Sequence, residues 1–201
     1  AKTGAAQFAP DHPYLSGAYA GSLEGYLFPK TYRFKAGTTA AGAIDAMLDQ
    51  FDVEFQQVDM TVPETRGMSV HEVVVLASMI EREAKVATER KLVSSVIYNR
   101  LSKGMLLEID ATIEYVLPGN RFRLRNSDLA LDSPYNTYRY KGLPPGAISN
   151  PGLASLMAAA SPAQTAYLYY VLTSKDGSHT FCKTQEEFLV AKAKSKEVFG
   201  K

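Results

Sequence analysis

The sequence predicts an α+β domain, with a helical core around the helix that contains Glu81 and a small antiparallel sheet that includes a C-terminal hairpin. Three observations predict this class. Apolar residues recur at helical spacing in several segments. A run rich in tyrosine and β-branched residues, 167–173, precedes a Lys-Asp-Gly turn and a second short strand pattern. The length of 201 residues suits one domain with a sizeable core.

Composition and charge exclude several functional classes. With 22 basic and 21 acidic residues, the net charge of +1 gives no electrostatic reason to expect nucleic acid as a partner. Cys182 is the single cysteine, so no intramolecular disulfide can form. The three histidines, His12, His71 and His179, have no recognised zinc spacing, so we expect neither a metal nor an organic cofactor. No apolar run approaches the roughly 20 residues that span a membrane, so a soluble fragment of a longer protein is expected.

The N-terminal part of the chain changes character near residue 23. Residues 1–22 are rich in Ala, Gly, Ser and Pro, which predicts an irregular lead-in or a linker before a domain over residues 23–201. Residues 23–34 concentrate aromatics and are expected to be extended chain with partly buried rings. An amphipathic helix is predicted over 38–55, where Ile, Met, Leu and Phe recur at helical spacing.

The next helix carries the most informative acidic residues. Ser69 and Glu72 form a capping-box pattern, so a helix should begin at about Ser69. Glu81 ends an apolar stripe on this helix, and a carboxyl group on an apolar face is desolvated, which raises its pKa as a general acid requires. Glu83 is turned by about 200° from Glu81 and is expected on a more mixed, wetter side. The alternative for Glu81 is a surface ion pair with Lys85 at i, i+4.

Two more helices are predicted in the middle of the chain. The pattern over 88–104 should form a helix that packs against the Glu81 helix as a hairpin, because the connection is short. A short helix is predicted over 111–117, and Asp110 is expected to cap it. The alternating arginines that follow, Arg121, Arg123 and Arg125, indicate a solvated strand or loop.

Two loops rich in Pro, Gly and Asn follow, over residues 133–138 and 142–152. Their composition excludes regular helix and specifies a stiff loop. Tyr, Asn and Thr side chains on a stiff loop suit sugars, because rings stack on pyranose faces while amides and hydroxyls bond sugar hydroxyls. A purely structural loop is the open alternative.

The C-terminal part predicts a helix, a hairpin and a helix. Pro151 precedes an alanine-rich helix over 153–160, and the hairpin covers 167–181. Thr184 and Glu187 form a second capping box, which opens a basic helix that should end near Gly200.

Several of these motifs, in this order, resemble the endolytic murein transglycosylase family, also called MltG or YceG-like. The resemblance extends from about residue 23 to the C-terminal helix. The chain departs from the family where Asp110-Ala111-Thr112 stands in place of a frequent Asp-Pro-Thr. The matching motifs are Leu23-Glu24-Gly25-Tyr26, Ala77-Ser78-Met79-Ile80-Glu81-Arg82-Glu83, Asn99-Arg100-Leu101, Ser133-Pro134-Tyr135-Asn136-Thr137-Tyr138, Gly142-Leu143-Pro144-Pro145-Gly146, Asn150-Pro151-Gly152 and His179-Thr180-Phe181.

The resemblance implies a carbon–oxygen lyase that acts on peptidoglycan and needs no cofactor. Such an enzyme cuts the β-1,4 bond between N-acetylmuramic acid and N-acetylglucosamine within glycan strands and leaves 1,6-anhydromuramyl ends. Glu81 is then the single catalytic acid and base, and Glu83 supports the site without touching substrate. The other matched residues are expected to line the glycan cleft: Glu24, Asp110, Asn136, Thr137, Tyr138 and His179.

The resemblance also implies a location and partners. Family members resemble membrane proteins with an N-terminal transmembrane helix and a LysM-like subdomain, and neither is expected in this chain. The catalytic domain would lie outside the cytoplasm of a bacterium, on glycan strands and near peptidoglycan synthases. The alternative function is a catalytically idle peptidoglycan-binding or scaffold module of the cell-wall synthesis machinery.

Overall fold

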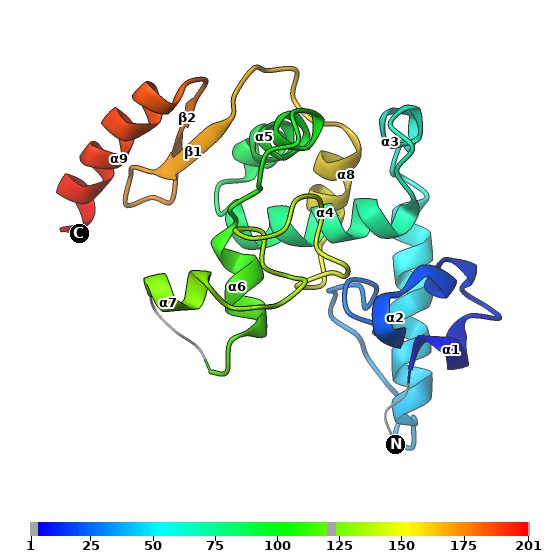
Figure 1. Ribbon diagram of the computed structural model, residues 1–201. Coiled ribbons are helices and arrows are strands. Elements are labelled where there is room, and N and C mark those ends of the chain that lie inside the picture. The colour runs from blue at the N-terminus through cyan, green and yellow to red at the C-terminus, as the bar shows by residue number, and fades with distance from the viewer. Residues whose placement is uncertain (1–3, 120–123, 201) are drawn as a thin grey trace.

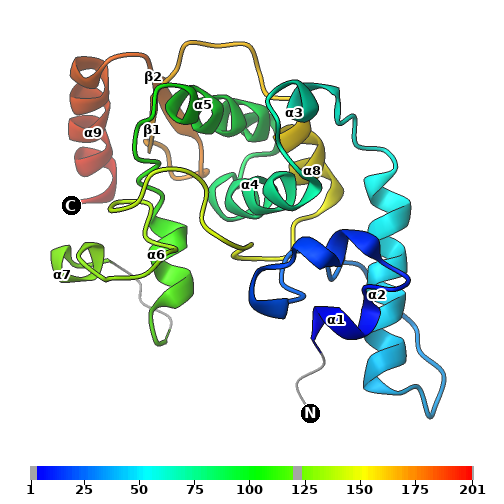
Figure 2. The same ribbon diagram turned by 45° about the vertical axis from the view of Figure 1, so that its right-hand side comes forward.

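A computed structural model describes residues 4–119 and 124–200, and its fold is α+β, as the sequence predicts (Figure 1). Helix α4 lies at the centre, with α5 and α8 packed against it. Helices α1 and α2 lie on one side of this centre, and the β-hairpin with α9 lies on the other, as a second view also shows (Figure 2). The helices are α1 (Ala5–Phe8), α2 (Ala40–Phe55), α3 (Thr61–Thr65), α4 (Val70–Glu83), α5 (Arg90–Ser102), α6 (Asp110–Val116), α7 (Asn126–Leu129), α8 (Leu153–Ala160) and α9 (Gln185–Phe199), with 3-10 turns η1 (Pro13–Gly17), η2 (Tyr19–Gly21) and η3 (Ala87–Glu89).

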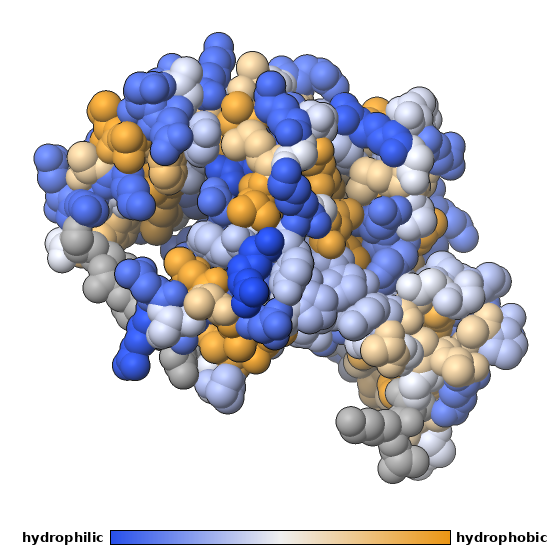
Figure 3. Space-filling model, viewed as in Figure 1, coloured by the Kyte–Doolittle hydropathy of each residue, from blue (hydrophilic) through white to orange (hydrophobic). Residues whose placement is uncertain are grey.

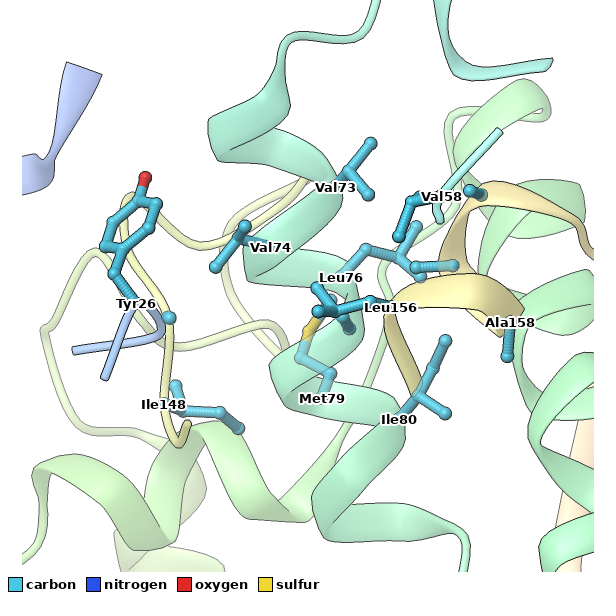
Figure 4. Packing of buried hydrophobic residues seen from close by; sticks show 14 of the residues in the cluster. Tyr26, Val58, Val73, Val74, Leu76, Met79, Ile80, Ile148, Leu156 and Ala158 are labelled. Carbon is cyan, nitrogen blue, oxygen red and sulfur yellow. The ribbon is translucent and has the colours of Figure 1, made fainter. Parts of the chain in front are cut away.

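Helix α4 begins with the predicted capping box and is buried on all sides along most of its length. The Ser69 hydroxyl accepts a hydrogen bond from the Glu72 backbone, and the Glu72 carboxylate accepts one from the Ser69 N–H. Leu76 and Met79 are both fully buried (Figure 4). The sequence predicted a wetter side of α4 for Glu83, which shares its face with Leu76 and Met79, and this prediction is wrong: α8 and neighbouring segments cover the helix.

The described part of the N-terminal lead-in is folded onto the domain. Residues 4–22 form short helical turns, and Phe8 and Leu15 belong to the main core. Residues 23–34 contain no strand but bury Tyr26 and Phe28, and α2 begins after a Thr39 cap close to the predicted start. Residues 4–22 therefore form a lead-in that packs on the domain, and they are not a linker.

The middle of the chain agrees with the sequence in its helices and differs at one cap. Helix α5 packs against α4 and α8. Asp110 does not cap α6: it is the first residue of the helix, Ile109 holds the cap position, and no side-chain cap bond forms there. Arg121 and Arg123 lie outside the described residues, and Arg125 directly precedes α7.

The predicted hairpin and its following helix are confirmed. Strands β1 (Tyr169–Leu172) and β2 (His179–Cys182) pair antiparallel with Tyr170 opposite Phe181. Helix α9 packs on this hairpin, starts at a Thr184 capping box and ends at Gly200 in the left-handed conformation. Within 4–119 and 124–200, no helix has the length and apolar character to cross a membrane.

Candidate active site

Glu81 lies in the last turn of α4, two residues before its end, and is half-buried. Its Oε2 accepts a hydrogen bond from the Gly152 N–H at 3.2 Å, where the chain enters α8. Backbone N–H groups at the start of a helix are a natural site for a carboxylate. Glu81 therefore has one oxygen oriented by the protein while the side chain keeps part of its surface open to solvent.

The loop that supplies Gly152 is fastened along α4 by polar contacts. The Ser78 hydroxyl accepts from the Ile148 N–H at 3.0 Å, and the Ser149 hydroxyl donates to the Ser78 carbonyl at 3.0 Å. At the other end of the loop, His71 Nε2 lies 2.8 Å from the Pro145 carbonyl. The stiff loop predicted over 142–152 is thus a wall beside Glu81, held in place by the same helix that carries the carboxylate.

The motif around Gly25 completes this wall from the N-terminal side. The N–H groups of Gly25 and Leu27 both donate to Asn150 Oδ1, at 2.8 and 3.2 Å. Gly25 has a φ of +95°, and an added Cβ would lie 2.6 Å from Ala147 Cβ and 2.7 Å from Val74 Cγ1. Only glycine fits this approach, because a side chain would meet both the loop and α4.

Glu24 lies near the aromatic residues Tyr115 and Tyr135. It is half-buried, and burial raises the pKa of its carboxyl group. The rings of Tyr115 and Tyr135 lie 5.1 Å apart, and the charge of Glu24 contributes to the raised pKa of both, after burial. These residues form an acidic and aromatic surface of the kind that binds sugars.

Glu83 has a different setting from Glu81. Its Oε2 accepts a hydrogen bond from the Tyr170 hydroxyl at 2.9 Å. Burial raises the Glu83 pKa to about 7, the Tyr170 hydrogen bond opposes this, and the negative charges of Asp110 and Glu114 add to it. Periodicity alone could not predict this, because Tyr170 comes from the distant hairpin.

Asp110 and Tyr138 are brought together. The Tyr138 hydroxyl donates a short hydrogen bond to Asp110 Oδ1. Burial and this bond raise the pKa of Tyr138, so its hydroxyl keeps its proton. Since Asp110 also acts electrostatically on Glu83, these three residues form one polar cluster between α4, α6 and the 133–138 loop.

Asn136 and Thr137 lie beneath that cluster and are buried. Asn136 Nδ2 donates to the backbone carbonyls of Leu129, at the end of α7, and Leu131, at 3.0 and 2.7 Å, and its Oδ1 accepts from the Tyr138 N–H. Thr137 Oγ1 accepts from the Ile109 N–H at 3.0 Å and lies 2.9 Å from Thr112 Oγ1. Their polar atoms are engaged with protein, so they position Tyr138 and α6.

His179 joins the site through the hairpin. Its Nδ1 lies 2.7 Å from Glu89 Oε2, and its backbone N–H donates to Glu89 Oε1 at 2.9 Å. The imidazole meets the Tyr170 ring edge-on at 5.4 Å between centroids. His179 thus packs against the tyrosine that holds Glu83, and the sequence reasoning missed both Tyr170 and Glu89, which stand outside any recognised motif.

The surface is hollowed between the part that carries α9 and the part that carries α6 and α7, near the carboxyl end of α4 (Figure 3). A separate hollow of about 540 Å³ lies between β2 and α9. None of the sequence-predicted site residues lines that second hollow, so it is not part of the candidate site.

Comparisons with known proteins agree with this arrangement. A Bacillus subtilis protein named endolytic murein transglycosylase is 42% identical over 175 residues, which cover 86% of this chain and 48% of that protein. A Streptococcus pneumoniae protein of the same name is 34% identical over 82% of this chain and 31% of its own length. The chain therefore spans less than half of either of these relatives.

A solved structure and a family model extend the comparison. A crystal structure of a YceG-like protein from Listeria monocytogenes superposes with a TM-score of 0.82 at 37% identity, over 92% of this chain and 62% of that one. The model of the YceG-like family matches residues 3–194, which include every candidate site residue described above. The chain belongs to the YceG-like family.

Proposed function

We propose that this protein is a peptidoglycan lytic transglycosylase that cuts the β-1,4 bond between N-acetylmuramic acid and N-acetylglucosamine within glycan strands. The observation that carries the proposal is the setting of Glu81 in a chain of this family: a half-buried carboxyl group, oriented by the Gly152 N–H beside a fastened loop. The relatives' name, endolytic murein transglycosylase, supplies the substrate class.

The proposed reaction needs one carboxyl group. Protonated Glu81 donates its proton to the glycosidic oxygen as the bond from that oxygen to C1 of the muramic acid breaks. The C6 hydroxyl of the same sugar then closes on C1, and the Glu81 carboxylate accepts its proton. One strand ends in 1,6-anhydromuramic acid, the other gains a free 4-hydroxyl, and Glu81 regains its starting state.

A hydrolase would require a further group. Glycosidases that use water ordinarily place a second carboxylate across the scissile bond, as a nucleophile or to activate water. The neighbouring acid, Glu83, is held by Tyr170 within the cluster around Asp110, on a different side of α4 from Gly152. Intramolecular attack by the sugar removes the need for that second carboxylate.

The remaining site residues are assigned by what their polar atoms contact. We assign four residues to the glycan cleft: Glu24 from the segment around Gly25, and Asp110, Tyr138 and His179 from the cluster around Glu83 and Tyr170. Asn136 and Thr137 support the cleft from the protein interior, because their polar atoms already form hydrogen bonds with the chain. This domain would act where peptidoglycan lies, outside the bacterial cytoplasm.

Product analysis tests the proposal. The chain is incubated with purified peptidoglycan, and the released glycans are examined by mass spectrometry. Anhydro-ended fragments that the wild type forms and Glu81→Gln does not form are the expected result. Glu64→Gln, which changes an exposed acid on α3, serves as the control and should act as the wild type does.

Two results would overturn the proposal in different ways. Ordinary reducing ends would indicate a hydrolase and contradict the one-carboxylate mechanism. Binding to peptidoglycan without any cleavage by the wild-type chain would favour the glycan-binding module instead.

A further inference from the structure

His12 is a buried histidine far from the candidate active site, in the turn between α1 and η1. It is only 2% exposed. Its Nδ1 lies 2.7 Å from Asp52 Oδ2, whereas its Nε2 is buried and has no hydrogen-bond partner in the described chain. A buried polar atom without a partner lowers the stability of the folded chain, so a ligand that binds this nitrogen would remove that penalty.

The unpartnered nitrogen faces acidic residues of α2. Asp45, Asp49 and Asp52 are spaced at i, i+4 and i+7, which places them on one face of the helix. Nε2 lies 3.5 Å from Asp45 Oδ1 and 4.0 Å from Asp49 Oδ1. Ligand atoms of His12, Asp49 and Asp52 lie within 4.8 Å of one another, whereas Asp45 is placed by its distance to Nε2 alone.

The contacts of Nδ1 determine which nitrogen is free to bind. A neutral imidazole carries one N–H, and Asp52 is placed to accept it from Nδ1, which leaves the Nε2 lone pair available. A carboxylate that fixes the ring in this way is the usual support of a metal-bound histidine. The Tyr14 hydroxyl lies beside the same groups; burial and then Asp52 raise its pKa, so it keeps its proton.

We propose that His12 Nε2, Asp45 and Asp49 bind one divalent transition cation such as Zn²⁺, with Asp52 holding the imidazole in the required tautomer. Imidazole nitrogen and carboxylate oxygen are ligands that suit this class of ion. In a tetrahedral site with bonds of about 2.1 Å, neighbouring ligand atoms are roughly 3.4 Å apart. Asp45 stands at nearly that separation, and the side chain of Asp49, 72% exposed, is free to close the remaining gap.

Such an ion would tie the N-terminal segment to α2. The segment over 4–22 contributes Phe8 and Leu15 to the core, and His12 lies between them. Because the ion would bind the folded chain more tightly than the unfolded chain, it should raise the melting temperature. The competing state is a doubly protonated imidazole that pairs with Asp52 and Asp45 and leaves no lone pair for an ion.

Calorimetric titration of the chain with Zn²⁺ tests the site. One ion should bind per chain, and Asp49→Asn, a change at an exposed side chain, should weaken binding by about tenfold or more, as should His12→Gln. Asp11→Asn is the matched control: it removes an exposed acid next to His12 that is not a proposed ligand, and it should bind as the wild type does. Ca²⁺, which prefers oxygen ligands, should bind much more weakly than Zn²⁺.

Nitrogen NMR of the imidazoles gives a second readout that does not depend on folding of the His12→Gln variant. Addition of Zn²⁺ should shift the Nε2 resonance of His12 in the wild type and in Asp11→Asn, with a matching rise in melting temperature. Equal Zn²⁺ binding by Asp49→Asn and Asp11→Asn would overturn the site. So would a His12 ring that stays protonated on both nitrogens at saturating Zn²⁺.

Discussion

Two glutamates near the carboxyl end of α4 lie on different sides of the helix and have different surroundings. Glu81 faces the start of α8, where a backbone N–H orients it and part of the side chain stays exposed. Glu83, two residues later, faces the hairpin and α6, where a tyrosine hydroxyl donates to it, and burial, with a smaller contribution from neighbouring acids, raises its pKa to about 7. The helix is the same, so the difference comes from what packs against each side.

The surroundings of the two acids support the proposal that Glu81, rather than the more deeply buried Glu83, is the catalytic acid. Burial raises the pKa of Glu83, yet its Oε2 accepts a hydrogen bond from Tyr170. Glu81 combines orientation by Gly152 with access from solvent, which a group that exchanges protons with substrate needs. Four experiments test this difference between the two acids.

The largest effect is expected from the two isosteric variants of these acids. Glu81→Gln removes the proton donor and should lower the rate of anhydro-product formation on the order of 10³-fold, within the range seen for general acids. Glu83→Gln keeps the hydrogen-bonding shape beside Tyr170 and should retain measurable activity. A complete loss in Glu83→Gln that matches Glu81→Gln would break the distinction. The measurement is the initial rate of product release from peptidoglycan.

A change in the wall beside Glu81 should have the next largest effect. In Gly25→Ala the added methyl group would lie 2.6 Å from Ala147 Cβ at a φ of +95°, so overpacking and strain combine to cost about 3 kcal/mol. Gly37→Ala is the control, because its φ is +87° but no atom lies within 4 Å of an added Cβ; it should cost about 1 kcal/mol. Urea unfolding measures both, and equal losses would show that the close approach to α4 is unimportant.

Local signals in the sequence predicted much of this fold. The capping boxes at Ser69 and Thr184 fixed two helix starts, because both partners lie within four residues of each other. The hairpin was equally visible in its tyrosine-rich run and tight turn. Glu81 could be singled out because its apolar stripe belongs to one helix.

What the sequence could not predict depends on residues that meet only in the folded chain. Tyr170 contacts Glu83 from the hairpin. Asp110, which was expected to cap α6, instead accepts a hydrogen bond from Tyr138. Glu89 contacts His179, and no sequence motif indicates this contact. The raised pKa of Glu83 follows from this tertiary packing, which no helical periodicity contains.

The pH dependence of stability should report the setting of Glu83. Its folded-state pKa of about 7 exceeds the value of 4.5 expected for an unfolded chain, so the folded state holds a proton that the unfolded state loses. The resulting stabilisation is fully present below about pH 4.5 and is lost as the pH rises to about 7. Its size is at most about 3 kcal/mol, since one pKa unit corresponds to about 1.4 kcal/mol.

Glu83→Gln removes this titration. Its free energy of unfolding minus that of the wild type should therefore increase between pH 5 and pH 8, because only the wild type loses stability over this range; urea unfolding at both pH values measures the difference. Glu64→Gln, at an exposed position, should follow the wild-type pH dependence. If the free energies of unfolding of the wild type and Glu83→Gln change in parallel with pH, the pKa of Glu83 is not raised in the folded chain.

The smallest effect is expected from Tyr170→Phe, which removes only the hydroxyl that donates to Glu83. The loss should be about 1 kcal/mol at pH 5, where Glu83 is protonated, and about 2 kcal/mol at pH 8, because hydrogen bonds to charged groups are stronger. Tyr169→Phe is the control, since that ring stacks on Phe188 and points to the other face of the strand. If the loss of unfolding free energy does not depend on pH, the Tyr170 hydroxyl does not interact with the charge of Glu83. The hairpin side of α4 would then differ from the Gly152 side in packing alone.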